Sequence, residues 1–210
     1  MQPERFLDDL PVVAILRGVS PDNVIAVAEV LHDAGIRVIE VPLNSPDPYR
    51  SIERLDRTFG ERCLCGAGTV LAPEEAERAH AAGARLIVSP NADARVIART
   101  VALGLVPMPG FATASEAFTA IAAGASRLKL FPAATYGAGH AQALSAVLPS
   151  GVRLYAVGGI GAGQVGEWVR AGIAGFGFGS ELFRPTYALD EIENRARAIV
   201  SAVRTAIAEK

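Results

Sequence analysis

Short apolar runs alternate with longer segments of helical periodicity along the whole chain. The apolar runs start roughly 20 to 26 residues apart and are predicted to be strands, over 12–18, 38–43, 63–70, 85–90, 105–110, 127–132, 153–159 and 175–180. Most are apolar at consecutive positions, which is typical of parallel strands that are covered on both faces. The pattern therefore predicts eight strand–helix units.

The segments between these runs carry helix start and stop signals. The first helix is predicted over about 21–34, with Ser20 as its N-cap ahead of Pro21, and the last over about 188–208. Five helices are expected to end at a glycine that leads directly into the next strand, namely Gly35, Gly83, Gly104, Gly124 and Gly172. Glycine is favoured there because the residue after a helix often adopts a left-handed conformation.

Eight strand–helix units with no clear linker favour a single (β/α)8 barrel, a TIM barrel, over residues 1–210. A doubly wound open sheet shares the alternation and is the main alternative. That fold normally shows a glycine-rich fingerprint at its first strand–helix turn, whereas this turn reads Leu16-Arg17-Gly18-Val19-Ser20. The barrel is therefore the preferred interpretation.

Composition and charge exclude several classes of partner. The chain has 20 basic and 22 acidic residues and a net charge of −2, so it lacks the basic surplus of proteins that bind nucleic acid or an anionic membrane. No stretch is long and apolar enough to span a membrane, and the first residues do not resemble a signal peptide. Cys63 and Cys65 lie in an apolar run and are expected to be reduced core thiols. We expect a soluble, cytoplasmic protein.

The use of lysine is unusual. The chain contains eighteen arginines but only two lysines, Lys129 and Lys210. Lys129 lies in an apolar strand, where strand periodicity puts it on one face with Phe131; the same rule puts Glu40 on one face of the second strand. If both faces point into the barrel, a buried amine and a buried carboxylate share one cavity.

A buried ion pair is the structural alternative for Lys129 and Glu40. Arginine would serve such a pair better, and it cannot lose its proton to become a nucleophile, whereas lysine can. Because this chain uses arginine for almost every other cation, Lys129 is predicted to be catalytic. Glu40 is predicted to act with it.

Glycines at the ends of the seventh and eighth strands form a second candidate site. Gly158 and Gly159 follow one strand, and Gly179 and Ser180 follow the other. Barrels often bind phosphate at these two strand ends through backbone N–H groups, although tight turns would also explain the glycines. His32, His80 and His140 fall in predicted helices with no spacing suited to a metal, so no metal site is expected.

Six motifs, in order along nearly the whole chain, closely resemble the class I 2-keto-3-deoxy-6-phosphogluconate and 6-phosphogalactonate aldolases. They are AILRG at 14–18, VIEVPLNSP at 38–46, GAGTV at 66–70, LKLFPA at 128–133, AVGG at 156–159 and GS at 179–180. The second and fifth motifs look like the galactonate branch. The gluconate branch typically has a threonine where this chain has Val157.

The resemblance implies a role for each matching residue. Lys129 resembles the lysine that forms the Schiff base, and Glu40 the general acid/base. Arg17 and Thr69 resemble the residues that hold the pyruvyl carboxylate, Phe131 and Pro90 the apolar walls around the imine, and Gly159, Gly179 and Ser180 the phosphate site. Val157, just before Gly158, is expected to lie near the C4 hydroxyl of the substrate.

The resemblance also implies a reaction: cleavage of 2-dehydro-3-deoxy-6-phosphogalactonate, a phosphorylated keto sugar acid, to pyruvate and D-glyceraldehyde 3-phosphate. No cofactor or metal is implied, and the family is commonly homotrimeric. Alternatives within the lyases are the gluconate epimer and 4-hydroxy-2-oxoglutarate as substrates. An alternative of another class is a phosphosugar isomerase or phosphate-binding barrel without imine chemistry.

Overall fold

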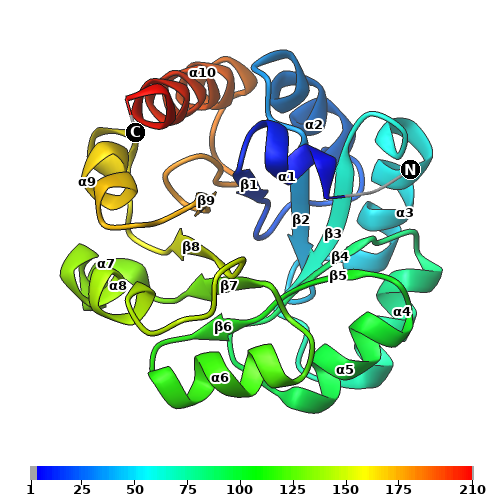
Figure 1. Cartoon of the computed structure of the whole chain (residues 1–210). Helices are drawn as coiled ribbons and strands as arrows, with labels where there is room; N and C mark the ends of the chain where they lie inside the picture. The colour runs from blue at the N-terminus through cyan, green and yellow to red at the C-terminus, as the bar shows by residue number, and fades with distance from the viewer. Residues whose placement is uncertain (1–3, 210) are drawn as a thin grey trace.

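The structure of the protein, a computed structural model, describes residues 4–209. Its parallel strands form one sheet that curls into a nearly closed barrel surrounded by helices (Figure 1), in the order β5-β4-β3-β2-β1-β9-β8-β7-β6. The strands are β1 (Val12–Ile15), β2 (Val38–Pro42), β3 (Leu64–Gly68), β4 (Leu86–Val88), β5 (Val106–Met108), β6 (Gly110–Phe111), β7 (Arg127–Leu130), β8 (Arg153–Val157) and β9 (Gly175–Phe178). The predicted (β/α)8 barrel is confirmed.

Each of the eight predicted strands is present, and the fifth is divided in two. Its first part, β5, pairs with β4, and its second part, β6, pairs with β7. Pro109 lies between them and has no N–H to donate to a neighbouring strand, while its carbonyl accepts a hydrogen bond from Lys129 N at 2.8 Å. One extended segment thus joins the two edges of the sheet.

The helices alternate with the strands as predicted. They are α1 (Arg5–Asp9), α2 (Val24–Asp33), α3 (Pro48–Phe59), α4 (Pro73–Ala81), α5 (Ala94–Ala102), α6 (Ala114–Ala122), α7 (Ala133–Tyr136), α8 (Ala138–Ser145), α9 (Val165–Arg170) and α10 (Leu189–Ala208), with a 3-10 turn, η1 (Ala162–Gln164), before α9. The last helix begins within one residue of the prediction and packs against α2 and α9, which completes the ring (Figure 1). Within residues 4–209, no helix combines the length and apolar character needed to cross a membrane.

The predicted helix-ending glycines are confirmed, but the predicted N-cap of the first long helix is wrong. All five helix-ending glycines have positive φ angles, between 71° and 107°, so the predicted left-handed residues are confirmed. The prediction of Ser20 as N-cap is wrong, because α2 begins three residues later and Asn23 is its N-cap. The carbonyl of Ser20 accepts hydrogen bonds from the N–H groups of Asn23 and Val24, each at 3.1 Å, so residues 20–23 form a turn ahead of the helix.

Large apolar side chains fill the half of the barrel interior that lies nearer the N-terminal ends of the strands. They are Val13, Val38, Leu64, Leu86, Val88, Val106, Met108 and Tyr155 from the strands, with Phe6 and Leu7 from α1. Sequence analysis did not identify α1, whose five residues are too few to show a helical period. In Figure 1 this helix lies in front of β1 and β2, at the end where the strands begin. It closes that end of the interior.

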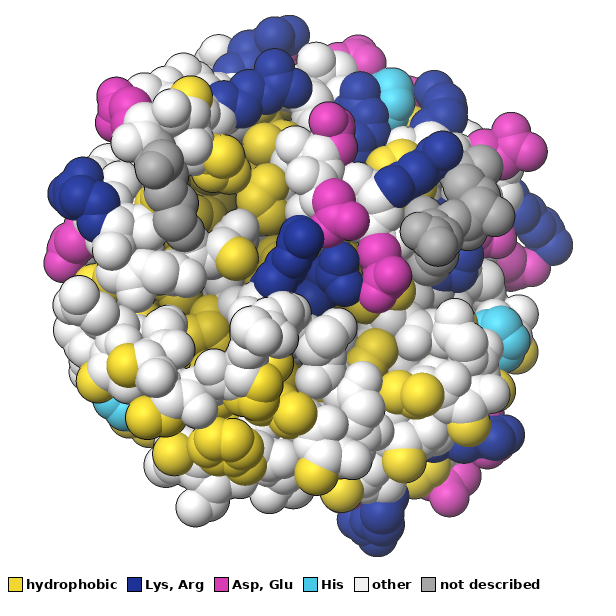
Figure 2. All heavy atoms as spheres, viewed as in Figure 1, with side chains coloured by type: hydrophobic (Ala, Val, Ile, Leu, Met, Phe, Trp, Pro, Cys, Tyr) yellow, Lys and Arg dark blue, Asp and Glu magenta, His cyan; other side chains and the backbone are white. Residues whose placement is uncertain are grey.

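Ion pairs hold α1 against the barrel. The side chain of Arg127, at the start of β7, is 8% exposed and pairs with Glu4 at 2.9 Å and Asp8 at 3.0 Å. Asp8 also pairs with Arg153, at the start of β8, at 2.6 Å. Figure 2, viewed from the same side, shows basic and acidic side chains gathered near the centre of this face.

Substitution Arg127→Ala is expected to lower the free energy of unfolding by about 2 kcal/mol, since a buried guanidinium with two carboxylate partners is lost. Arg197→Ala is the matched control, because Arg197 pairs with Glu193 on an exposed face of α10. Its cost should stay below about 0.5 kcal/mol. Urea denaturation of both variants measures the difference. Equal losses would show that the cluster at α1 contributes no more than a surface ion pair.

Candidate active site

An amine and a carboxylate lie inside the barrel, toward the carboxyl ends of the strands. Lys129 of β7 is 7% exposed and Glu40 of β2 is 2% exposed. Leu128 and Leu130 belong to the apolar layer between strands and helices, so the alternation of β7 turns Lys129 inward. Its Nζ lies 4.8 Å from the centre of the Phe131 ring.

Burial moves the pKa values of this pair toward each other. Loss of hydration lowers the pKa of Lys129 to about 8, although the charge of Glu40 opposes the shift and that of Arg17 adds to it. Loss of hydration raises the pKa of Glu40 to about 7, against the opposing charges of Lys129 and Arg17. Both groups can therefore exchange a proton near neutral pH, as general acid/base and nucleophilic groups must.

The carboxylate of Glu40 lies against the backbone of β3. A Cβ atom added at Gly68 would stand 1.8 Å from Glu40 Oε2, so no other residue fits at this position without moving the carboxylate. The same oxygen is buried and has no hydrogen-bond partner within the described part of the chain. A buried carboxylate oxygen that is left unpaired in this way calls for a functional explanation. A glycine inside a strand is the sequence signal for such a close approach, but sequence analysis did not use it.

The loops after β1, β2 and β3 meet at the carboxyl ends of the strands, next to Lys129 and Glu40. The guanidinium of Arg17, after β1, donates to Asn44 Oδ1 at 2.6 Å and to Thr69 Oγ1 at 3.4 Å. Thr69 has φ +57°, an unusual angle for a β-branched residue and one that is often found at functional sites. Arg17 is exposed, so its remaining donors can bind an anion.

The predicted phosphate-binding residues line one pocket of about 270 Å³. Its walls include Arg17, Phe131, Val157, Gly158, Gly159, Gly179 and Ser180, together with Ile15, Ile160, Gly177 and Glu181, which sequence analysis did not predict. Gly158 and Gly159 have φ angles of +97° and +75°, which other residues rarely adopt. Arg17 and Phe131 connect this pocket to the lysine and the carboxylate.

Other candidates lie outside the pocket. Pro90 does not line it but packs against Gly110, whose register partner across the sheet is Lys129. His80 is exposed, and His140 is bound to the carbonyl of Ala112 at 2.7 Å. Cys63 and Cys65 are free and buried. Residues 4–209 contain no group of three or more His, Cys, Asp or Glu side chains that could hold a metal ion.

Comparison with known proteins gives consistent matches. Residues 4–197 match the model of the family described as KDPG and KHG aldolase. The 2-dehydro-3-deoxy-6-phosphogalactonate aldolase of Escherichia coli (strain K12) is 44% identical over 94% of this chain and 97% of its own.

Solved structures agree with these matches. A structure described as native KDPGal superposes with a TM-score of 0.93 at 44% identity, covering 95% of this chain and 97% of its own. The KDPG aldolase of Legionella pneumophila, described with pyruvate captured as a covalent carbinolamine intermediate, has a TM-score of 0.82 at 29% identity and covers 98% of each chain. With an amine and a carboxylate buried inside its barrel, this chain therefore belongs to the KDPG and KHG aldolase family, and it is a carbon–carbon lyase of the class I type.

Proposed function

We propose that this lyase cleaves 2-dehydro-3-deoxy-6-phosphogalactonate to pyruvate and D-glyceraldehyde 3-phosphate through a Schiff base on Lys129. The observation that carries the proposal is the burial of Lys129, the one lysine among residues 4–209, close enough to the buried Glu40 for each charge to act on the other's pKa. The choice of substrate is supported by the name of the Escherichia coli relative, which is 44% identical.

The reaction begins at the neutral amine of Lys129. With a pKa of about 8, about a tenth of the amine is neutral at pH 7, far more than for an exposed lysine. Its lone pair attacks the C2 carbonyl to give a carbinolamine, whose hydroxyl leaves as water with a proton from the Glu40 carboxyl, so that a protonated imine and the Glu40 carboxylate remain. The pyruvate adduct described for the Legionella pneumophila relative supports this step.

Glu40 moves the protons. Its carboxylate takes the proton of the C4 hydroxyl while the C3–C4 bond breaks, and the electron pair of that bond flows into the imine to form an enamine. D-glyceraldehyde 3-phosphate leaves. The protonated carboxyl then returns its proton to C3, and water hydrolyses the protonated imine to release pyruvate and the free amine, with the remaining proton passing to Glu40. A pKa of about 7 lets one group perform both transfers.

The ends of the substrate are assigned to the surrounding loops. Arg17 and Thr69 bind the carboxylate next to the imine, since Arg17 has exposed donors beside the Thr69 hydroxyl. Phe131 and Pro90 are assigned as the apolar walls around the imine, with Pro90 on the side of Gly110 and outside the phosphate pocket. Gly159, Gly179 and Ser180 bind the phosphate, with Gly158 shaping the turn through its left-handed backbone. The homotrimer implied by the resemblance and the cytoplasmic location expected from the sequence remain part of this proposal.

Treatment with pyruvate and borohydride is expected to add mass irreversibly to Lys129, and Lys129→Arg should abolish both this trapping and turnover. Mass spectrometry of the digested protein locates the adduct. The test is sharp because Lys210 and the N-terminal amine are the only other primary amines. Trapping that persists in the arginine variant would refute the assignment of Lys129. A lack of trapping in the unmodified protein would favour an isomerase or a phosphate-binding barrel.

Substitution Gly68→Ala should displace the Glu40 carboxylate and reduce cleavage by about 10²- to 10⁴-fold, as Glu40→Gln should. Both variants should still form some imine with pyruvate, because Lys129 remains. Gly139→Ala is the matched control, since a Cβ there meets nothing within 4 Å. Near-normal turnover in a folded Gly68→Ala or Glu40→Gln variant would move the acid/base role to another residue.

Substitution Val157→Thr should raise the gluconate-to-galactonate ratio of kcat/KM by about tenfold, because a hydroxyl can contact the C4 hydroxyl of one epimer only. Val157 is 4% exposed and lines the pocket, so the new group would face the substrate. Val147→Thr repeats the change at an exposed position, where Val147 is 59% exposed, and should leave the ratio unchanged. An unchanged ratio in Val157→Thr would place the choice between epimers elsewhere.

A further inference from the structure

A second cavity opens beside the candidate phosphate site. It measures about 360 Å³ and is lined by Arg17, Gly179, Ser180, Phe183, Arg184 and Pro185. The first three of these residues also line the pocket next to Lys129. The two cavities therefore meet at Gly179 and Ser180, and Arg184 contributes the one guanidinium besides Arg17 to their walls.

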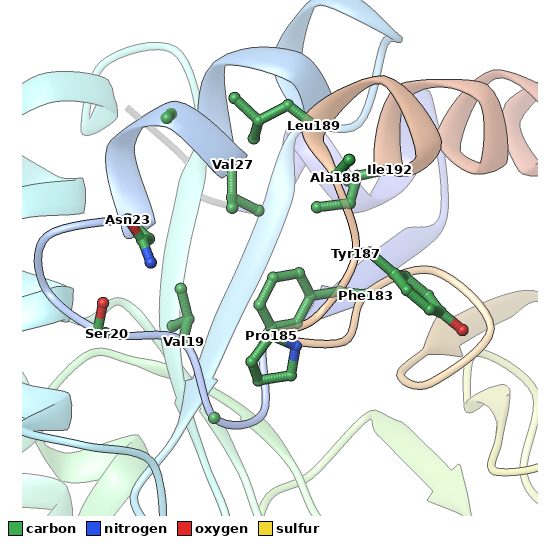
Figure 3. Close-up of a pocket in the computed structure, with 12 residues that line it drawn as sticks. Val19, Ser20, Asn23, Val27, Phe183, Pro185, Tyr187, Ala188, Leu189 and Ile192 are labelled. Atoms are coloured by element: carbon green, nitrogen blue, oxygen red, sulfur yellow. The ribbon is translucent and has the colours of Figure 1, made fainter.

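The segment that carries Arg184 is anchored on both sides. The carbonyl of Gly179 accepts hydrogen bonds from the N–H groups of Leu182 at 2.9 Å and Phe183 at 2.8 Å, and Phe183 is buried. Figure 3 shows the ring of Phe183 beside Pro185, in a third cavity that Val27 and Ile192 also line. The backbone on the N-terminal side of Arg184 is thus fixed by a turn and a buried ring.

Pro185 fixes the C-terminal side of Arg184. A Cβ atom at Gly18 would lie only 3.0 Å from Pro185 Cγ, and Gly18 has φ +84°, so the turn after Arg17 fits closely against this proline. The position of Arg184 is therefore tied to the loop that carries the proposed carboxylate-binding arginine.

Tyr187 links the side chain of Arg184 to Ser180. The guanidinium of Arg184 lies 5.6 Å from the centre of the Tyr187 ring, and the Tyr187 hydroxyl donates to the carbonyl of Ser180 at 3.3 Å. A guanidinium placed over an aromatic ring is held without using its N–H donors. Within residues 4–209, this leaves the N–H donors of Arg184 available to an anion beside Gly179 and Ser180.

A phosphate bound at Gly179 and Ser180 would need a second cation beside Arg17. Arg17 already donates to Asn44 and Thr69, and the proposed function gives its remaining donors to the carboxylate. Glu181 lines the same pocket and would repel a phosphate, which carries close to two negative charges at neutral pH. Backbone N–H groups and the Ser180 hydroxyl supply no full positive charge. An arginine fork would supply both charge and paired donors.

We propose that Arg184 binds the phosphate of the substrate and so makes the enzyme specific for phosphorylated 2-keto-3-deoxy sugar acids. This rests on the proposed function, and it adds a specificity-determining residue to the glycines and Ser180. Arg184 acts on binding and takes no part in the steps at Lys129.

The test compares Arg184→Ala with the unmodified enzyme on the phosphorylated substrate and on the same sugar acid without its phosphate. KM for the phosphorylated substrate should rise about tenfold with kcat little changed, while kcat/KM for the unphosphorylated one should stay the same. The KM of Arg184→Lys for the phosphorylated substrate should fall between those of the unmodified enzyme and Arg184→Ala, because lysine keeps the charge but lacks the paired N–H donors of arginine. Low ionic strength is needed, since salt screens an exposed charge.

Arg197→Ala is the control for the loss of one positive charge on an exposed helix face, and it should not change either substrate's kinetics. An Arg184→Ala variant that handles the phosphorylated substrate as the unmodified enzyme does would overturn the proposal. An equal loss on both substrates would overturn it too, by showing a general structural effect. Pyruvate trapping on Lys129 should be normal in Arg184→Ala, so failure of the Schiff-base proposal would be seen separately.

Discussion

Burying an amine and a carboxylate together is the constraint on which the site depends. Each group loses hydration inside the barrel, which disfavours its charged form, and the opposite charge of its neighbour partly restores that form. The result is a lysine pKa of about 8 and a glutamate pKa of about 7. An amine can act as a nucleophile and a carboxylate as a proton carrier under the same conditions.

The distribution of large and small side chains along the barrel makes room for this pair. Leu64, Leu86 and Tyr155 fill the half where the strands begin, and α1 closes that end. Toward the carboxyl ends, glycine replaces them. Gly68 leaves space for the Glu40 carboxylate and Gly177 for the side chain of Val157. The barrel is therefore filled where its strands begin and open at their carboxyl ends, where loops from several strands surround the opening.

Features set by local periodicity could be predicted from the sequence. The alternation of apolar runs predicted the strands, and the period of two predicted that Lys129 lies on the face opposite Leu128 and Leu130. The presence of only two lysines beside eighteen arginines made Lys129 the candidate nucleophile without any structural information. The division of the fifth strand was missed, although Pro109 is visible in the sequence, because it shows only when the two edges of the sheet are paired.

Features that depend on contacts between distant segments could not be predicted. Helix α1 is held by ion pairs to Arg127, more than a hundred residues away. The importance of Gly68 follows only once Glu40 is seen to lie against it. Arg184 lies beside Gly179 and Ser180, the proposed phosphate site, because a turn at Gly179 and the fit of Pro185 against Gly18 bring it there. None of these contacts leaves a periodic signal in the sequence.

The lowered pKa of Lys129 can be measured directly because the chain has only two lysines. Protein labelled with 13C at the lysine ε-carbon should give two NMR signals, and Lys129→Arg should remove one and so assign it. The assigned signal is expected to titrate with a midpoint near 8. A midpoint near the ordinary value of 10.5 would show that burial beside Glu40 does not prepare the amine for attack, contradicting the central claim.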